Sequence, residues 1–437
     1  MTWQQQAVSK ISQIIPSARV STDPGDLATY GKDWTQGFDP KPGLIVFPKS
    51  TEEVAAIAKL CHEHNWPIVP SGGRTGLAAA AVAQQGEVVL SLEKMNQIVA
   101  VDTVGLTVTA EAGVKTEELQ NAAKDAGLFF PIDLGAKGSC HIGGNIATNA
   151  GGLKFIRFGG TREQVLGIEV VLADGSVLNL DGGLKKDNTG YDLKQLFIGS
   201  EGTLGIITKA TLRLAVQPRD VQLLCLATDE FAKIPQILGE AFRRQFTVAA
   251  FEYFTGRCHQ LVLQYHSNNR SPFEQQYPFY NLIELEGVSA EDESVGELLE
   301  YLFESGLAVD GVLATNSTEF HELWAHRELI TESLAMNGHV HKNDISVAVK
   351  NLARFVGEME QLLARQTSDD VELVTFGHIG DGNLHINYIA PKSVNYSRFQ
   401  AAAKAIEAEI FGLVRQYNGS ISAEHGIGLL KKDQLSY

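Results

Sequence analysis

Cysteine is scarce in this sequence, and long apolar runs and an excess of positive charge are both missing. The 437 residues include only four cysteines and no C-x-x-C pair, which argues against a disulfide-stapled secreted fold and favours reduced thiols. The longest apolar run, Leu77–Ala83, is far shorter than the roughly 20 residues that a membrane-spanning helix needs. The N-terminus lacks a basic stretch followed by an apolar one, so we expect no signal peptide and a cytoplasmic location.

The charge balance further restricts the partners of the protein. A formal net charge of −16 makes nucleic acid and anionic membrane surfaces unfavourable partners. If the substrate is an anion, local cations or a metal must reverse this sign at the site. Hydrophobic residues make up 44% of the chain and charged residues 20%, which is a globular composition, and the length predicts two or three domains.

The first half of the chain alternates short apolar strands, helices and glycine loops. Gly43–Phe47 is predicted to be a buried strand. Ser50 begins a capping box, and a helix is expected to follow it. Trp66–Val69 is predicted to be a second strand, with a glycine loop directly after it. This order predicts a βαβ-like unit whose loop suits a phosphate. Further strands are expected at Val88–Leu92, Thr107–Glu111, Glu169–Leu172 and Ile206–Leu214, and a helix at Thr116–Ala126 that ends at Gly127.

Glycine loops become rare after Pro218, which indicates a separate α+β domain. Strands are expected at Gln222–Ala227, Leu261–His266 and Asn281–Leu285, a hairpin at Val371–Phe376 and Asn383–Ile389, and helices at Glu230–Arg243, Glu291–Glu304, Glu319–Met336, Asn351–Arg365 and Tyr396–Tyr417. We therefore predict three parts, residues 1–216, 217–395 and 396–437.

Two glycine-rich segments, Pro70–Leu77 and Leu134–Gly152, carry the first chemical signal. Glycines let backbone N–H groups approach a phosphate closely, and a pyrophosphate cofactor would use such loops well. Neither segment has the spacing of a Rossmann or a Walker loop. From the residues alone, each segment is either a phosphate-binding loop or a plain turn.

A second signal lies in the C-terminal half, where histidines and carboxylates recur near glycines. His378 and His385 flank a Gly-Asp-Gly turn, and Glu424 and His425 follow the last predicted helix. Imidazoles and a carboxylate suit Zn²⁺ or Mn²⁺, but the spacing matches no helical metal motif, and hydrogen bonding within a turn is the alternative. The charges of the segment Trp324–Lys342 could equally belong to a solvated helix face.

Several motifs in order give the sequence a specific resemblance. The two glycine loops, Asp187–Leu193 and Ile198–Ile206 resemble the FAD-binding domain of the vanillyl-alcohol oxidase superfamily. Asp33-Trp34-Thr35, Leu134–Cys140 and Lys186–Leu193 are similar to its D-2-hydroxyglutarate dehydrogenase branch, which is related to D-lactate dehydrogenases. The resemblance implies an α+β fold: a two-subdomain FAD-binding domain (1–216), an α+β substrate or cap domain (217–395) and a C-terminal helical segment (396–437) that returns to the flavin.

The resemblance also implies which residues bind the cofactor. The FAD-binding residues would be Pro70, Ser71, Gly72, Gly73, Arg74, Thr75, Gly76, Leu77, Ser139, Ile142, Gly143, Gly144, Asn145, Thr148, Asn149, Gly152, Glu201 and Ile206. Some relatives link FAD covalently through a histidine in the first loop. Because this loop has Arg74 and no histidine, we expect noncovalent FAD.

For the reaction, the resemblance implies FAD-dependent oxidation of a small anionic D-2-hydroxy acid, D-2-hydroxyglutarate or D-malate before D-lactate or glycolate. A divalent metal, Zn²⁺ or Mn²⁺, would be bound by His378, His385 and Glu424, with His425 as the base. The substrate would be bound by Arg327, Lys342, Asn387 and Thr331.

Other classes remain open from the residues: a metal-dependent hydrolase, or a flavin-binding protein without dehydrogenase activity. The expected electron acceptor is an electron-transferring flavoprotein or a quinone, and a homodimer is one expected assembly. Relatives continue beyond the Glu-His-Gly motif through another helix, whereas this sequence ends at Tyr437, so an incompletely represented chain with weaker flavin affinity is also an expectation.

Overall fold

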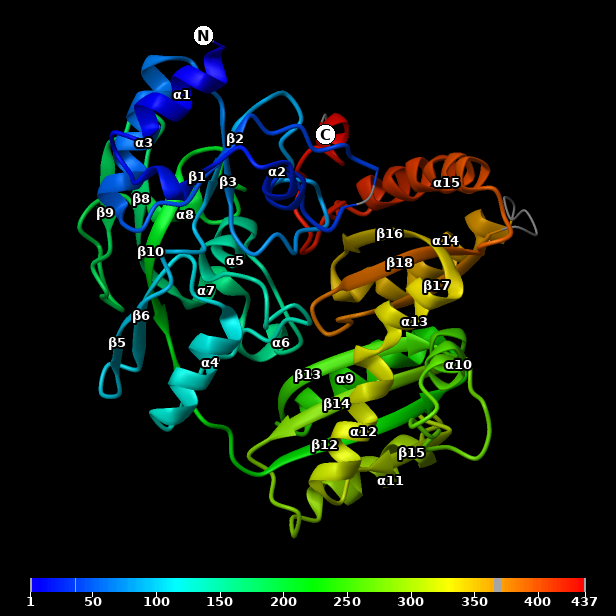
Figure 1. Cartoon of the computed structure of the whole chain (residues 1–437). Coiled ribbons are helices and arrows are strands. Elements are labelled where there is room, and N and C mark those ends of the chain that lie inside the picture. Colours follow the sequence, from blue (N-terminus) through cyan, green and yellow to red (C-terminus); the bar gives the residue numbers. More distant parts are fainter. Residues whose placement is uncertain (1, 36, 365–370, 436–437) are drawn as a thin grey trace. The chain divides into compact units, whose positions relative to one another are not determined.

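The computed structural model describes residues 2–35, 37–364 and 371–435, which form two compact units (Figure 1). Unit 1 comprises Met1–Gly152, Gly159–Gln217 and Glu424–Tyr437, and unit 2 comprises Leu153–Phe158 and Pro218–Ala423. The long helix that we grouped with the C-terminal segment therefore belongs to unit 2, and only the last residues return to unit 1. Three residues that bound our predicted segments lie outside the described residues: Met1, Arg365 and Tyr437.

Unit 1 contains two larger sheets with helices around them. Its helices are α1 (Trp3–Ile11), η1 (Ser17–Arg19), α2 (Pro24–Tyr30), α3 (Thr51–Glu63), α4 (Thr116–Asp125), α5 (Ile142–Thr148), α7 (Thr161–Gln164), α8 (Lys194–Phe197) and η4 (Lys432–Gln434). Its strands are β1 (Val20–Ser21), β2 (Leu44–Val46), β3 (Ile68–Ser71), β4 (Val88–Ser91), β5 (Ile98–Asp102), β6 (Thr107–Glu111), β7 (Leu128–Phe129), β8 (Val165–Val171), β9 (Val177–Leu180), β10 (Ile206–Arg213) and β11 (Ala215–Val216).

The first sheet of unit 1 has the order β1-β2-β4-β3, with β2 and β3 both parallel to β4. The predicted strand-helix-strand order is therefore present, but β4 is inserted between the two strands. Ser50 caps α3 by accepting the N–H of Glu53, as predicted. The Glu53 carboxylate instead binds Arg19 and the N–H of Lys49, so it does not complete the capping box.

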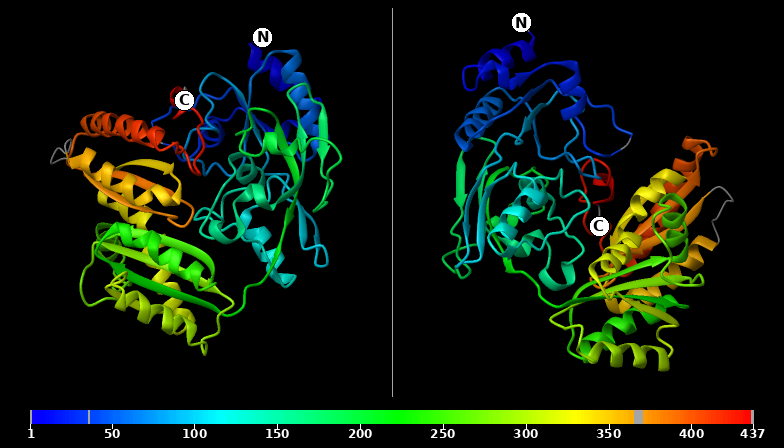
Figure 2. Two further views of the ribbon diagram at one scale, coloured as in Figure 1. Left: turned by 180° about the vertical axis from the view of Figure 1, so that it is seen from behind. Right: turned by 60° about the horizontal axis from the view of Figure 1, so that its bottom comes forward.

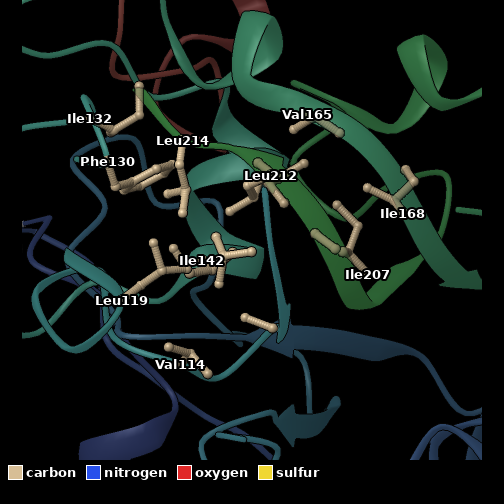
Figure 3. Close-up of a cluster of buried hydrophobic side chains, with 14 of the residues drawn as sticks. Val114, Leu119, Phe130, Ile132, Ile142, Val165, Ile168, Ile207, Leu212 and Leu214 are labelled. Atoms are coloured by element: carbon tan, nitrogen blue, oxygen red, sulfur yellow. The ribbon is translucent and has the colours of Figure 1, made fainter. Parts of the chain in front are cut away.

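The second sheet, of order β5-β6-β10-β8-β9, packs against α4 and α5 around one apolar core (Figure 3). Ile142 and Ile146 of α5 insert into this core beside Leu119 and Leu212, and all four are buried. Burial of this kind stabilises a fold by about 1.5–3 kcal/mol per large aliphatic side chain. It fixes α5, the helix that carries the second glycine segment.

Unit 2 is built on one seven-stranded antiparallel sheet of order β15-β12-β14-β13-β17-β18-β16. Its strands are β12 (Val221–Thr228), β13 (Thr247–Thr255), β14 (Phe279–Glu286), β15 (Asp310–Leu313), β16 (Gly338–Ser346), β17 (Glu372–Gly377) and β18 (Asn383–Pro391). Its helices are α6 (Phe155–Phe158), η2 (Phe231–Lys233), α9 (Ile234–Arg243), α10 (Gly256–Tyr265), α11 (Ser294–Glu304), α12 (Ser317–Glu328), α13 (Ile330–Asn337), η3 (Val349–Asn351), α14 (Leu352–Ala364) and α15 (Tyr396–Gln416).

Helices cover both faces of this sheet (Figure 2). Successive residues of a strand point to opposite faces. On β13, Tyr253 contacts Phe231 of η2, next to α9, whereas Phe254 belongs to a core shared with α10, α12 and α13. His341 of β16 binds Glu407 of α15, so α15 lies on the Tyr253 side. None of the described helices is long and apolar enough to cross a membrane.

Three expectations for unit 2 were wrong or incomplete. Leu261–His266 is not a strand but the end of α10 and its C-cap His266, because Cys258, Leu261 and Val262 recur at helical spacing and are buried together. The helix expected at Glu319–Met336 is divided at Leu329 into α12 and α13. Strands β13 and β16 were not predicted, and both carry residues of the candidate site.

Candidate functional site

The two glycine segments meet in unit 1 and leave no room for a side chain at Gly73. A Cβ atom on Gly73 would lie 2.1 Å from the carbonyl oxygen of Ser139, and one on Gly72 would contact His141 and Gly144. A side chain at Gly73 would therefore push the two segments apart. Gly73 is therefore required by this packing of one backbone against the other, whereas a Cβ at Gly72 would make only ordinary van der Waals contacts.

A cleft of about 850 Å³, its open mouth included, lies along these segments. Among the predicted FAD-binding residues, those lining it are Pro70, Ser71, Gly72, Gly73, Arg74, Thr75, Gly76, Gly143, Gly144, Asn145, Thr148, Glu201 and Ile206. Five predicted residues lie outside the lining: Leu77, Ser139, Ile142, Asn149 and Gly152. Ile142 packs into the core, and Asn149 ends α5 in a left-handed conformation with φ 49°.

The polar atoms of the cleft fit a pyrophosphate cofactor such as FAD. None of the backbone N–H groups of residues 72–76 donates a hydrogen bond to any residue that the structure describes. Three buried side-chain atoms of the lining, Asp33 Oδ2, Ser71 Oγ and His141 Nδ1, also lack a partner within the described part of the chain. Buried polar groups are almost always hydrogen-bonded in native proteins, so a polar ligand is expected here.

His141 was not among the predicted FAD-binding residues, although it lies in the second glycine segment. Burial, with Arg74 nearby, lowers the pKa of His141 to about 4. Its imidazole is therefore neutral at pH 7 and can donate or accept a hydrogen bond. Asp33 was quoted only as part of a motif, and burial raises the pKa of its carboxyl group.

The C-terminal segment from Glu424 onward is hydrogen-bonded to Gly152 and Glu201 of unit 1. The N–H of Gly152 donates to Glu424 Oε1 at 3.1 Å. Glu201 accepts the N–H groups of Ile427 and Gly428 at 3.0 and 3.1 Å. Glu201 therefore positions the backbone just after His425 in addition to lining the cleft.

In unit 2, strand pairing brings together predicted metal and substrate residues. In the antiparallel pair β16 and β18, Lys342 lies opposite Asn387, and Asp344 lies opposite His385. Directly opposite residues share a face of the sheet, and residues two apart on a strand share it too. These four side chains therefore form one polar patch on the face that α12 and α13 cover.

His378 and His385 are close to each other, and each has a buried carboxylate beside it. Their ring centroids are 5.3 Å apart. His378 Nδ1 lies 2.7 Å from Glu252 Oε1, and His385 Nδ1 lies 3.6 Å from Asp344 Oδ1. Imidazoles that ligate metals almost always have such a carboxylate or carbonyl partner on the second ring nitrogen, so this donor set fits a divalent metal.

Arg327 and Lys342 both lie at this site, but they differ in whether an anionic side chain is paired with them. Arg327 Nε donates to Glu252 Oε2 at 2.8 Å, and its guanidinium lies 4.7 Å from the centre of the Phe376 ring. No residue in the described ranges hydrogen-bonds to its Nη1 or Nη2. Lys342 has no anionic partner in the same ranges, and desolvation lowers its pKa from the usual 10.5.

The remaining predicted substrate residues differ in burial. Asn387 is buried, and its Nδ2 donates to the carbonyl oxygen of His385 at 3.3 Å. Thr331, near the start of α13, is exposed.

Sequence reasoning missed Glu252 and Asp344, although each left a signal. Glu252 interrupts the apolar stretch Val248–Phe254, and an acid inside a buried strand needs a partner. Asp344 lies in a polar segment that was not predicted to be a strand. Their partners are far away in sequence, so pairing could not be inferred.

Comparisons with known proteins agree with this geometry. Residues 42–181 match the family model described as an FAD binding domain, and residues 217–437 match that of the C-terminal domain of FAD linked oxidases. The D-2-hydroxyglutarate dehydrogenase of Stutzerimonas stutzeri is 43% identical over 98% of this chain and 92% of its own length. The mitochondrial D-2-hydroxyglutarate dehydrogenase of Rattus norvegicus is 41% identical over 97% and 78%. A putative mitochondrial D-lactate dehydrogenase of Schizosaccharomyces pombe is 38% identical over 98% and 83%.

Solved structures show the same fold at low sequence identity. p-Cresol methylhydroxylase matches with a TM-score of 0.79 at 18% identity, over 100% of this chain and 91% of that one. Alkyldihydroxyacetonephosphate synthase matches with a TM-score of 0.74 at 18% identity, over 95% and 80%. The resemblance to the vanillyl-alcohol oxidase superfamily is confirmed, and the matches favour a flavoenzyme over a hydrolase. The chain belongs to the FAD-linked oxidase family, in the branch of the D-2-hydroxyglutarate dehydrogenases, and is an FAD-dependent dehydrogenase.

Proposed function

We propose that this enzyme oxidises a D-2-hydroxy dicarboxylate, D-2-hydroxyglutarate before D-malate, to the 2-oxo acid. The observation that carries the proposal is the pair of cations in unit 2. Both Arg327 Nη atoms and the Lys342 ammonium lack protein partners in the described ranges, beside a polar patch that includes His385 and Asn387. Arg327 is already paired with Glu252 through Nε, but the desolvated Lys342 ammonium has no anionic partner among the described residues, and a substrate carboxylate would relieve the cost of that unpaired charge. The names of two of the similar proteins point to the same substrate.

We propose that FAD is bound noncovalently along the cleft of unit 1, with its pyrophosphate on the N–H groups of residues 72–76. When bound, FAD supplies the two-electron acceptor of the reaction. Arg74 lies in the first loop with φ 58°, and its guanidinium is 4.3 Å from the centre of the Tyr30 ring. Arg74 offers a charge to the phosphates but no nucleophile for a covalent link.

We propose that a divalent metal, Zn²⁺ or Mn²⁺, is held by His378, His385 and Glu424. The support is the carboxylate beside each histidine, together with the Glu-His-Gly motif of the family resemblance. Bound there, the metal would supply a Lewis acid that lowers the pKa of the substrate hydroxyl.

In this proposal the protein residues bind and orient the substrate and move one proton. Arg327 binds one carboxylate through its Nη edge, which suits a bidentate contact, and Lys342 binds as a point charge. Asn387 and Thr331 would add hydrogen bonds. The imidazole of His425 takes the proton of the C2 hydroxyl, since a histidine titrates near neutral pH.

A monocarboxylate such as D-lactate or glycolate is the second candidate substrate, supported by the similar protein named as a putative D-lactate dehydrogenase. For the electron acceptor we propose an electron-transferring flavoprotein or a quinone, for the location the cytoplasm, and for the assembly a homodimer.

The test is a comparison of kcat/KM for D-2-hydroxyglutarate, D-malate, D-lactate and glycolate with an artificial electron acceptor. L-2-Hydroxyglutarate serves as the control, because it carries the same charges with the opposite configuration at C2. We expect D-2-hydroxyglutarate to lead and the L-enantiomer to be inert. Equal efficiency with D-lactate would refute the dicarboxylate assignment and leave the flavin-dependent activity intact.

A further inference from the structure

We propose that Glu252 is a positioning residue that couples metal binding to substrate binding, an inference that rests on the proposed function of His378 and Arg327. Glu252 does not touch either ligand in this proposal. It acts by fixing one side chain that would bind the metal and one that would bind the substrate.

Each oxygen of the Glu252 carboxylate is used by a different partner. Oε1 lies 2.7 Å from His378 Nδ1, and Oε2 accepts Arg327 Nε at 2.8 Å. The Glu252 side chain is 1% exposed and that of Arg327 7%. Inside the protein, such charge-assisted hydrogen bonds are short and directional. One carboxylate therefore fixes the imidazole and the guanidinium relative to each other.

The sheet explains why Glu252 meets His378. Strand β13 pairs with β17 at Tyr253, opposite Gly377, and at Phe254, opposite Phe376. The next position in this register places Glu252 opposite His378, where β17 ends. The N–H of Gly380 then donates to the carbonyl oxygen of Phe251 at 3.2 Å, which holds the turn after His378 against β13.

The bond from Glu252 selects which nitrogen of His378 can bind a metal. When Nδ1–H donates to the carboxylate, Nε2 carries the lone pair. A carboxylate in this position also makes the imidazole a stronger donor, and losing such a partner costs metal sites about 10–100-fold in affinity. Glu252 therefore sets both the direction and the strength of this ligand.

The same carboxylate orients Arg327 for the substrate. With Nε bound to Glu252 and the guanidinium plane against Phe376, the two Nη atoms remain for a carboxylate. An arginine fixed in this way loses less side-chain entropy when the substrate binds. A displacement at Glu252 would change the metal ligand and the substrate cation together.

The alternative is that Glu252 only stabilises the fold as a buried acid, and a matched control separates the two roles. Glu284 on the neighbouring strand β14 is also an almost fully buried acid, and it is paired with Lys154. Glu252→Gln and Glu284→Gln are compared with the wild-type holoenzyme. Gln offers one acceptor oxygen and one NH₂ group, so at position 252 it can accept from only one of its two partners.

The readouts are metal affinity, by chelator competition with Zn²⁺ and Mn²⁺, and KM for D-2-hydroxyglutarate. For Glu252→Gln we expect metal affinity about 10–100-fold weaker and a higher KM, with an unchanged flavin absorbance. Glu284→Gln should change neither quantity. Equal losses in both variants, or none in Glu252→Gln, would overturn the inference.

A second variant covers the case in which Glu252→Gln fails to fold. Arg327→Lys keeps the charge but removes the Nε bond, and coupling through Glu252 predicts weaker metal binding although Arg327 is no metal ligand. Unchanged metal affinity in Arg327→Lys would refute the coupling. If wild-type protein binds neither metal, the proposed metal site fails first and the inference fails with it.

Discussion

Replacing Lys342 by Met tests most directly whether the substrate carries a second carboxylate. Lys342 has no anionic partner among the described residues, so its removal orphans no acid. Removing Arg327 would be less clear, because it would leave the carboxylate of Glu252 buried without its cation. Met keeps most of the length of the side chain and removes only its charge.

The expected loss follows from the desolvation of Lys342. Truncating one partner of a desolvated charge pair costs about 2–5 kcal/mol, and 1.4 kcal/mol corresponds to a factor of ten. We therefore expect kcat/KM for D-2-hydroxyglutarate to fall by about 30- to 4,000-fold. D-Lactate has no second carboxylate, so its kcat/KM should change far less.

The depressed pKa of Lys342 adds a prediction on stability, with a definite sign. Because the folded pKa lies below 10.5, the unfolded chain holds this proton more tightly, and the charged lysine lowers stability below the folded pKa. Lys342→Met should therefore unfold at a higher temperature at pH 7, and the difference should shrink as the pH rises through the folded pKa and vanish above the unfolded pKa of 10.5. A lower melting temperature at pH 7 would refute the desolvation argument.

The kinetic assay is a steady-state titration of both substrates at pH 7 with one artificial acceptor. Lys350, which is exposed, supplies the control variant Lys350→Met, because it removes the same charge outside the polar patch. Proportional losses for D-lactate and D-2-hydroxyglutarate in Lys342→Met would contradict the assignment of Lys342 to the second carboxylate.

Three further predictions concern the metal, the base and the flavin. His378→Ala should bind Zn²⁺ and Mn²⁺ weakly and lose turnover while its flavin absorbance stays normal, because the cleft lies in unit 1; normal turnover by a metal-free preparation would contradict this. His425→Ala should lower kcat by about 10²–10⁴-fold with unchanged metal content, and an unchanged kcat would exclude His425 as the base. Acid precipitation should release the flavin into the supernatant, since Arg74 offers no covalent link; flavin retained in the pellet would direct attention to Cys140 and His141 of the same cleft.

The strands, helices and glycine segments of unit 1 could be predicted well from the sequence because the patterns that indicate them lie within short stretches of the chain. The strand expected at Thr107–Glu111 is β6, the helix expected at Thr116–Ala126 is α4 to within one residue, and Gly127 follows it with φ 74°. The two glycine segments were recognised from composition alone. That they pack on each other at Gly73 depends on sheet order, which the sequence does not show.

Unit 2 was harder because its informative residues break the patterns on which prediction depends. Strand β13 is buried on both faces, so it lacks the alternation of a half-buried strand, and β16 is polar because it carries Lys342 and Asp344. The pairing of Glu252 with His378 joins residues 126 positions apart. The ability of the histidines to bind a metal could be predicted from their residue type. The carboxylates that orient them could be identified only from the folded structure.

The charged side chains in and beside the polar patch do not give the excess of positive charge that we expected from the sequence. Arg327 and Lys342 were expected to reverse the net charge of −16 locally. In unit 2, however, two carboxylates accompany these two cations: Glu252 is paired with Arg327, and Asp344 lies two residues from Lys342 on β16 without an ion pair to it. The side chains alone therefore supply no excess of positive charge for a dianion, and in the proposed site the divalent metal must supply it.

Metal removal should accordingly weaken substrate binding as well as turnover, and it should weaken the binding of the dianion more. D-2-Hydroxyglutarate should lose more affinity than D-lactate when each is titrated by equilibrium dialysis against metal-free enzyme and against enzyme reloaded with Zn²⁺ or Mn²⁺. The reason is that the metal ion would attract each negative charge of the substrate over a short distance in a partly desolvated site, so a dianion loses more attraction than a monoanion when the metal is removed. If D-2-hydroxyglutarate binds the metal-free enzyme as tightly as the reloaded one, Arg327 and Lys342 suffice, and the charge argument is wrong.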